Sequence, residues 1–416
     1  MFQPATTDRG DIPGGSVRTF KRVEGSPIPV AADPPSRTTR RGFLKLAVGL
    51  GAGVALGGFA MYGLSRTGNT TREGEVPPSG GTEARYYVPM KGQGVRCELC
   101  PNHCTIAPGS RGVCEVRENR SGKLLTLVYG KPCTWHVDPI EKKPLYHFLP
   151  ATTAFSIATA GCNFECLYCQ NWEISQARPE DLDSIDMPPE KVVDLALQSG
   201  SACIAYTYNE PTIFYEYMYD TCKLARASGI KNLDVTNGFM NTEPLTELCK
   251  VMDAANVDLK GFSEDFYQNV CSGQLQPVLH YLLTMKEKGV WMEITNLIVP
   301  TLNDKTEMIS DMCDWIVGDL GTDYPLHFSR FSPLYKLAHL PYTPVTILEQ
   351  AREIAMSKGI KYVYIGNVPG HAADNTYCHS CGQMLIERGL YFSVLQNNVD
   401  GGRCKFCGTR IPGVWA

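Results

Sequence analysis

The chain has 416 residues, of which 43% are hydrophobic and 20% charged, so it can bury a large core and is not a protein that is disordered throughout. Its net charge of −4 at pH 7 argues against a sequence-independent nucleic-acid binder, which normally has a basic face, and no nucleic-acid partner is expected. Eight of the 17 cysteines fall in four C-x2-C pairs, and in a long chain this spacing favours metal ligation over a disulfide framework.

Changes in composition along the chain predict six segments. The first is rich in proline, glycine, serine and charge and has no apolar period, which is typical of disorder. Two short cysteine-rich regions flank a long region in which strand and helix patterns alternate. The predicted segments are a disordered tail (1–36), a signal-like segment (37–64), a linker (65–84), a cysteine module (85–150), an alternating α/β region (151–370) and a second, zinc-ribbon-like cysteine module (371–416).

The signal-like segment 37–64 contains Arg40 and Arg41, followed by a glycine-rich, uncharged run from Leu46 to Leu64. It resembles a twin-arginine export signal, whose apolar region is only moderately hydrophobic. An ordinary membrane anchor is the alternative, because a run of this length can just span a bilayer. No small-x-small cleavage site is evident after Leu64, so we expect the segment to stay as an anchor and predict membrane association through residues 42–64. The sequence leaves open whether the protein works on the cytoplasmic or the exported side.

The first cysteine module carries four cysteines with the spacing C-x2-C-x3-C-x9-C. Four thiolates from one short stretch make a closed site for a metal. Zinc and an auxiliary iron–sulfur cluster both fit this spacing, and the sequence does not choose between them. The predicted ligands are Cys97, Cys100, Cys104 and Cys114.

The region 151–370 alternates apolar strand-like runs with helical patterns such as 188–200 and 212–230. This alternation predicts an α/β fold in which a parallel sheet closes partly or fully into a (β/α) barrel, with small cysteine-rich metal modules at both ends of the chain. In such a fold the active site gathers at the carboxyl ends of the strands. The predicted strands are 155–160, 203–208, 232–237, 256–260, 291–299, 326–331 and 361–366.

The loop after the first predicted strand reads "CNFECLYC" and contains Cys162, Cys166 and Cys169. This spacing suits an iron–sulfur cluster, and a cubane 4Fe–4S cluster normally takes four thiolates. Three thiolates leave one iron with an open coordination position, which is how catalytic metal sites bind their substrates. The alternative is a zinc site of three cysteines that a distant histidine or cysteine completes.

The C-x3-C-x2-C pattern, with Tyr168 before the last cysteine, resembles the signature of the radical S-adenosylmethionine (SAM) enzymes. The resemblance implies a 4Fe–4S cluster whose open iron binds the amino and carboxylate groups of SAM. It further implies an electron from a low-potential donor such as flavodoxin or ferredoxin, and reductive cleavage of SAM to a 5′-deoxyadenosyl radical that abstracts a hydrogen atom.

Later strand ends extend the resemblance. The family has a Gly-Gly-Glu-Pro-like turn that holds the methionyl amine, and here "TYNEP" retains Glu210 and Pro211 but replaces the two glycines. The segments "DVTNG" and "VDLKG" resemble those of glycyl-radical-enzyme activases, and "EITNLIVP" is expected near the ribose. No catalytic residue is assigned beyond the cluster. The implied cofactor contacts are Tyr168, Asn209, Glu210, Asn237, Lys260, Thr295 and Asn296.

The flanking segments "CELCPNHC", "DPIEKKPLYHF", "CQNWEISQ" and "CGTRIPGVW" together resemble the radical SAM enzyme of the AmmeMemoRadiSam system, a branch near the pyruvate formate-lyase activating enzymes. This resemblance covers about residues 90–415. It implies hydrogen abstraction from a protein glycine, another protein, a peptide or a small molecule, and does not say which. The alternative is an iron–sulfur electron-transfer protein that does not cleave SAM.

The second cysteine module contains two C-x2-C pairs separated by 22 residues, which is the spacing of a zinc ribbon or of a rubredoxin-like iron site. Zinc is the predicted metal, because thiolate zinc sites usually stabilise modules that are too small to bury a core. The predicted ligands are Cys378, Cys381, Cys404 and Cys407. We expect the remaining cysteines of the barrel region to be buried core thiols: Cys203, Cys222, Cys249, Cys271 and Cys313.

Overall fold

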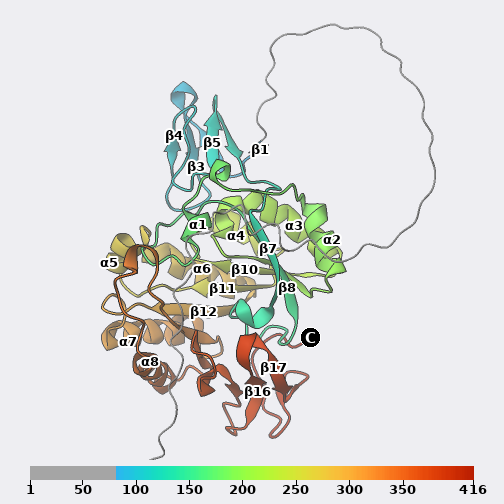
Figure 1. Ribbon diagram of the computed structural model, residues 1–416, viewed down its shortest axis with the longest axis vertical. Helices are drawn as coiled ribbons and strands as arrows, with labels where there is room; N and C mark the ends of the chain where they lie inside the picture. The colour runs from blue at the N-terminus through green and yellow to red at the C-terminus, as the bar shows by residue number, and fades with distance from the viewer. Residues whose placement is uncertain (1–80) are drawn as a thin grey trace, which may run out of the picture. The chain divides into compact units, whose positions relative to one another are not determined.

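An eight-stranded sheet, in the order β14-β13-β12-β11-β10-β9-β8-β7, forms the centre of the fold (Figure 1). Strands β8 to β14 are parallel, and β7 pairs with β8 in the antiparallel sense. The bounds are β7 Thr134–Pro139, β8 Thr153–Ala158, β9 Cys203–Tyr206, β10 Lys231–Thr236, β11 Ala254–Asp258, β12 Trp291–Ile298, β13 Leu326–Arg330 and β14 Val363–Gly366. The seven predicted strands are confirmed. Because β7 and β14 are the two edges of this sheet, the barrel is partial.

The computed structural model describes residues 81–416. The predicted tail 1–36, the twin-arginine-like segment 37–64 and nearly all of the linker 65–84 lie outside the described residues. Within residues 81–416, no helix is both long enough and apolar enough to cross a membrane.

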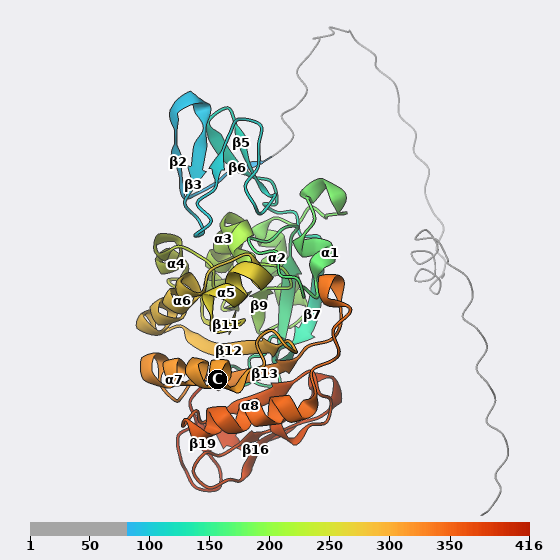
Figure 2. The same cartoon turned by 90° about the vertical axis from the view of Figure 1, so that its left-hand side faces the viewer.

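Helices follow the parallel strands and pack against them (Figures 1 and 2). The predicted helix 188–200 is confirmed as α2, which has a proline in its first turn, where no backbone N–H is needed. The predicted helix 212–230 is confirmed as α3, preceded by a 3-10 turn over Pro211–Phe214. The bounds are α1 Trp172–Ser175, α2 Pro189–Gln198, α3 Tyr215–Ala227, α4 Thr242–Leu248, α5 Glu264–Phe266, α6 Leu275–Lys288, α7 Thr306–Trp315 and α8 Val345–Ser357.

The N-terminal cysteine module consists of two three-stranded sheets, β1-β6-β5 and β2-β3-β4. It is joined to α3 by a buried ion pair, in which Arg117 Nη2 lies 2.6 Å from Glu216 Oε2. It also contacts the loop after β10, where the Asn241 N–H donates to the Leu99 carbonyl. The bounds are β1 Thr82–Glu83, β2 Tyr87–Pro89, β3 Val95–Cys97, β4 Thr105–Ile106, β5 Arg117–Arg120 and β6 Lys123–Thr126.

The C-terminal module has a three-stranded sheet, β15-β16-β17, and a hairpin of β18 and β19. Its last residues return to the segment before β8, because the Val414 N–H donates to the His147 carbonyl and the Leu149 N–H donates to Val414. In both views the two cysteine modules lie at opposite ends of the described residues, with the large sheet between them (Figures 1 and 2). The bounds are β15 Thr376–Tyr377, β16 Met384–Arg388, β17 Val394–Asn397, β18 Val399–Asp400 and β19 Arg403–Cys404.

A buried histidine anchors this C-terminal return. His147 donates from Nδ1 to the Pro412 carbonyl at 2.7 Å, so its Nε2 accepts from the Tyr364 hydroxyl at 2.6 Å. The carboxylate of Glu293 accepts the His147 backbone N–H and lies 2.7 Å from His327 Nε2. Burial lowers the pKa of His147 to about 4, so the ring is neutral at neutral pH.

Candidate active site

The carboxyl ends of the parallel strands open onto a cavity of about 920 Å³. This volume lies at the upper end of the range of ~300–1,000 Å³ that is usual for ligand pockets. The loop after β8 lines the cavity with Cys162, Cys166 and Cys169, as the predicted barrel requires. The rest of the wall comes from the ends of β9 to β14, from the segment before β8 and from the C-terminal module.

Hydrogen bonds to residues 270–271 hold the cysteine loop in place, a contact that the sequence did not predict. The Glu165 N–H donates to the Cys271 carbonyl and the Leu167 N–H to the Val270 carbonyl, at 3.0 and 2.9 Å. The two accepting carbonyls belong to the last residues of a π-helix, Tyr267–Cys271, which follows α5. A side chain at Gly273 would place its Cβ only 2.3 Å from the Phe164 ring, so glycine is needed there for this close approach.

Three cysteines, and no fourth, line this cavity among residues 81–416. Cys271 was predicted as a core thiol, and it is indeed buried, but its sulfur lies 3.5 Å from the Tyr168 hydroxyl, directly behind the loop. Burial raises the pKa of Cys162 and of Cys169 in the absence of a metal, and metal ligation deprotonates such thiols. Three thiols on one wall fit a 4Fe–4S cluster that keeps one iron open toward the cavity.

Glu210 lies at the end of β9 with both carboxylate oxygens already bonded within the protein. Oε1 accepts from the backbone and hydroxyl of Thr212 and from the Thr236 hydroxyl, and Oε2 accepts the Asn237 N–H at 2.7 Å. Burial raises the pKa of Glu210. The carboxylate therefore orders the adjacent strand ends.

The neighbouring Asn209 has the free acceptor. Its Nδ2 donates to the Gly161 carbonyl at 2.8 Å, while its buried Oδ1 has no partner among the described residues. Since Asn209 lines the cavity beside the cysteine loop, this oxygen is placed to accept from an ammonium group. An unpartnered buried acceptor is costly in an empty pocket, and a bound donor removes that cost.

Asn237, Lys260 and Thr295 also line the cavity. Asn237 donates from Nδ2 to Asn163 Oδ1 in the cysteine loop at 2.8 Å, and Lys260 Nζ lies 2.9 Å from Asp258. Asn296 does not line the cavity, and its Nδ2 donates instead to the Leu259 carbonyl. The reason is the alternation of side chains along β12, which turns successive residues to opposite faces.

Two lysines that the sequence did not predict, Lys142 and Lys143, line the cavity. Asp138 on β7 binds Lys142 Nζ at 2.8 Å and Lys143 Nζ at 2.6 Å, and it accepts from the Tyr208 hydroxyl. Burial alone would raise the pKa of Asp138. The hydrogen bonds from the two lysines and Tyr208 together hold this pKa well below its usual range. Burial lowers the pKa of Lys143 to about 8. The segment "DPIEKKPLYHF" contributed to the family resemblance, but its residue pattern did not predict that these lysines line the cavity.

The C-terminal cysteines form a closed set. The sulfurs of Cys378 and Cys407 lie 3.7 Å apart, those of Cys381 and Cys404 lie 3.8 Å apart, and all four lie within 4.8 Å of one another. A tetrahedral ion with metal–sulfur bonds of ~2.3 Å separates its sulfurs by about 3.8 Å. The arrangement fits a single tetrahedral zinc or iron ion.

Comparisons with known proteins agree with this geometry. The model of the radical SAM superfamily matches residues 156–316, which include the cysteine loop and strands β9 to β12. The chain belongs to the radical SAM superfamily. It is 48% identical over 330 residues to the uncharacterized protein MJ0808 of Methanocaldococcus jannaschii, a match that covers 79% of this chain and 98% of that relative.

A relative that is named for an activity is also similar. The pyruvate formate-lyase-activating enzyme of Clostridium pasteurianum is 25% identical over 161 residues, covering 38% of this chain and 66% of that relative. Among solved structures, a domain of the pyruvate formate-lyase-activating enzyme from Bacteroides vulgatus matches 40% of this chain and 99% of its own, with 16% identity and a TM-score of 0.36. SuiB of Streptococcus suis bound to SAM matches 55% of this chain and 52% of its own, with 12% identity and a TM-score of 0.40.

Proposed function

We propose that this radical SAM protein cleaves SAM reductively at a 4Fe–4S cluster held by Cys162, Cys166 and Cys169. The observation that carries the proposal is the placement of these three thiols on the wall of the strand-end cavity. When bound, the cluster supplies the electron that converts SAM into a 5′-deoxyadenosyl radical, which takes a hydrogen atom from the substrate.

The residues around the loop orient SAM. The free Oδ1 of Asn209 accepts a hydrogen bond from the methionyl ammonium, and Glu210 keeps this turn rigid through its bonds to neighbouring strands. Asn237, Lys260 and Thr295 offer polar groups elsewhere on the cavity wall, and Tyr168, within the loop, stacks on Phe266.

The substrate occupies the part of the cavity away from the cysteine loop. Besides the loop and the residues assigned to SAM, the cavity is lined by Lys142, His327 and Ser329, and by Leu390 of the C-terminal module. We infer that the hydrogen donor belongs to another protein, as in an activase-like reaction. Similarity to the activating enzyme of Clostridium pasteurianum supports this inference.

The electron comes from a low-potential donor such as flavodoxin or ferredoxin, reductants on which radical SAM enzymes generally depend. One electron per cleavage is enough, because homolysis of the sulfur–carbon bond produces methionine and one carbon radical. An iron–sulfur protein that only transfers electrons would show the same redox signals without forming 5′-deoxyadenosine.

Anaerobic reconstitution with iron and sulfide, followed by reduction and an assay for 5′-deoxyadenosine, tests the proposal. We expect product from the wild type and none from Cys166→Ala. Cys249→Ala, which removes a partly buried thiol outside the cavity, is the matched control and should retain activity. Equal product from wild type and Cys166→Ala, or none from a wild type with a full cluster, would contradict it.

A pair of asparagine variants tests how SAM is held. Asn209→Ala removes the free acceptor and should weaken SAM binding roughly 10- to 100-fold, the effect of losing one hydrogen bond to a charged group. Asn296→Ala removes a buried asparagine from the opposite face of β12 and should leave the dissociation constant unchanged. Titration of SAM into both reconstituted variants measures the difference, and equal losses would exclude the assigned contact.

We further propose that residues 42–64 tether the enzyme to a membrane, on the evidence of the twin-arginine-like pattern in the sequence. Fractionation of tagged full-length protein should find it with membranes, and Arg40→Lys with Arg41→Lys should change its distribution only if the twin-arginine route is used. A full-length protein found wholly in the soluble fraction would overturn the tether.

A further inference from the structure

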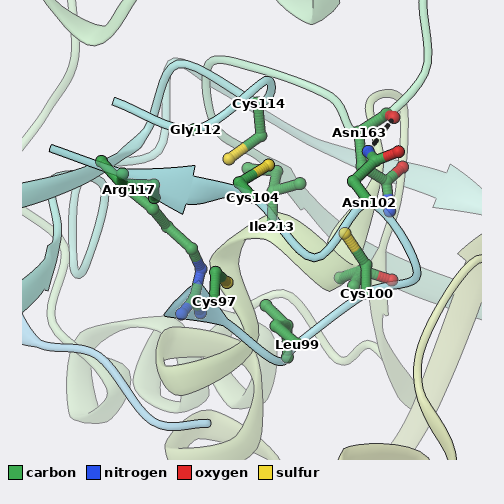
Figure 3. Close-up of a pocket in the computed structure, with 12 residues that line it drawn as sticks. Cys97, Leu99, Cys100, Asn102, Cys104, Gly112, Cys114, Arg117, Asn163 and Ile213 are labelled. Atoms are coloured by element: carbon green, nitrogen blue, oxygen red, sulfur yellow. Dashed lines mark hydrogen bonds between the residues drawn. The ribbon is translucent and has the colours of Figure 1, made fainter. Parts of the chain in front are cut away.

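The four cysteines of the N-terminal module enclose a small hollow of their own. Cys97, Cys100, Cys104 and Cys114 line a space of about 20 Å³ together with the apolar side chains of Leu99, Ile106 and Ile213 (Figure 3). A space of this size admits about one water-sized sphere. The module lies apart from the strand-end cavity, whose wall includes none of these four cysteines.

The sulfurs of this hollow are spread more widely than those of the C-terminal set. Within residues 81–416, the C-terminal cysteines, whose sulfurs all lie within 4.8 Å of one another, are the only group of three or more His, Cys, Asp or Glu side chains gathered closely enough to hold a single metal ion. A mononuclear zinc ion would draw sulfurs to about 3.8 Å, since each bond is ~2.3 Å long. A cubane cluster binds each thiolate at a different iron, and therefore suits four sulfurs around a wider space.

A buried arginine provides a second, independent sign of an anionic centre. Arg117 lines the hollow and is only 2% exposed, and Figure 3 shows its guanidinium beside Cys97. Its terminal nitrogens bond to the Glu216 carboxylate and to the Arg85 carbonyl, but its buried Nε has no partner among the described residues. A buried N–H donor without a partner is costly, and a cluster thiolate would accept it.

The backbone also favours thiolates here. The Val113 N–H donates to the Cys104 sulfur at 3.5 Å, and N–H donors stabilise the ionised form of a thiol.

The hollow is directly joined to the loop of the active site. Asn102 stands between two of the four cysteines and donates from Nδ2 to the carbonyl of Asn163 in the "CNFEC" loop at 3.0 Å (Figure 3). Asn163 itself lines the hollow. On the other side, a Cβ at Gly161 would lie 2.5 Å from the Cys114 carbonyl, so the two loops pack backbone to backbone.

We propose that Cys97, Cys100, Cys104 and Cys114 hold a second iron–sulfur cluster, of the 4Fe–4S type, next to the active-site loop. Arg117 donates its Nε–H to this centre and offsets part of its negative charge. The inference concerns the ligands of this hollow and stands whether or not SAM is cleaved at the other site.

The test removes the active-site cluster and asks what iron remains. The variant Cys162→Ala, Cys166→Ala, Cys169→Ala is purified anaerobically, reconstituted with iron and sulfide, and analysed for iron, acid-labile sulfide and zinc. We expect about four irons and four sulfides per chain, with an electron paramagnetic resonance signal after reduction. Adding Cys100→Ser and Cys104→Ser should abolish both the sulfide and the signal.

Iron without sulfide, or zinc in place of iron, in the three-alanine variant would overturn the proposal. If that variant does not fold, Mössbauer spectra of the wild-type holoenzyme decide the question, with about eight cluster irons per chain expected and about four as the contradicting result. The pair Arg117→Gln with Glu216→Gln removes the buried ion pair without leaving one charge behind. It should retain the cluster and shift its midpoint potential to more negative values, and an unchanged potential would exclude the role of Arg117.

Discussion

The two four-cysteine modules have the same number of ligands but differ in how they are built. The C-terminal sulfurs lie 3.7 and 3.8 Å apart within each of two pairs, and Cys381 and Cys407 are exposed. The N-terminal cysteines surround a hollow with an apolar wall, a buried arginine and a direct contact with the active-site loop. The two sets therefore share a ligand count but differ in the exposure of their cysteines and in the charged side chain that lies beside them.

The modules also differ in how they are fastened to the large sheet. The N-terminal module relies on an ion pair, Arg117 with Glu216, whose two side chains are almost fully buried. The C-terminal module relies on the neutral ring of His147, which bonds to the Pro412 carbonyl and to Tyr364. The N-terminal attachment depends on two charged side chains, whereas the C-terminal attachment depends on an uncharged histidine. Acid and mutation should therefore affect the two attachments differently.

The largest effect is expected from loss of the C-terminal ion. Cys378→Ser with Cys404→Ser removes two of its four ligands, and metal binding contributes on the order of 10 kcal/mol to the folding of such modules. We expect residues 371–416 to become sensitive to protease, as limited proteolysis with mass spectrometry would detect. Cys313→Ser, which changes a buried cysteine of α7, is the matched control, and equal sensitivity in both variants would contradict a metal-dependent module.

A smaller effect is expected when the ion pair of the N-terminal module is broken. Glu216→Gln leaves the Arg117 charge buried without its counter-ion, which typically costs about 3–5 kcal/mol. Denaturant unfolding should show this loss in the free energy of unfolding. The double variant Arg117→Gln with Glu216→Gln should lose less, and a loss as large as that of the single variant would show that the pairing is not what stabilises the module.

Acid should weaken the C-terminal attachment. His147 has a pKa of about 4 in the folded protein, below the ordinary value, so between these two values the unfolded chain binds more protons. The stability that the neutral ring provides is fully present above about pH 6.5 and is lost as pH falls toward 4. Hydrogen exchange in residues 408–416 should rise over this range, and no change there would contradict the attachment.

The smallest effect concerns the contact between the N-terminal hollow and the active-site loop. Asn102→Ala removes one neutral hydrogen bond, worth about 1 kcal/mol, and should lower the rate of SAM cleavage about fivefold. Phe392→Ala, which changes a cavity-lining side chain of the C-terminal module, should leave SAM cleavage without substrate unchanged. The 5′-deoxyadenosine assay compares the two variants. A larger loss of rate in Phe392→Ala than in Asn102→Ala would contradict this prediction.

The sequence predicted the seven parallel strands because strands covered on both faces read as continuous apolar runs, as in β9, where every residue is buried. It did not predict β7, whose Trp135 and Val137 are exposed and whose partner β8 follows after a long connection. An exposed edge strand with mixed polarity lacks the apolar signal on which such a prediction depends.

What the sequence by itself determined is local: the spacing of the cysteines within each loop and the order of strands and helices, both of which depend on near neighbours in the chain. Only the tertiary structure decided which groups meet at the cavity. It placed the free acceptor on Asn209 and not on Glu210, turned Asn296 away, and brought Lys142 and Lys143 to the wall. Such pairings depend on strand register and on contacts between distant segments, which one residue's neighbours in the chain do not specify.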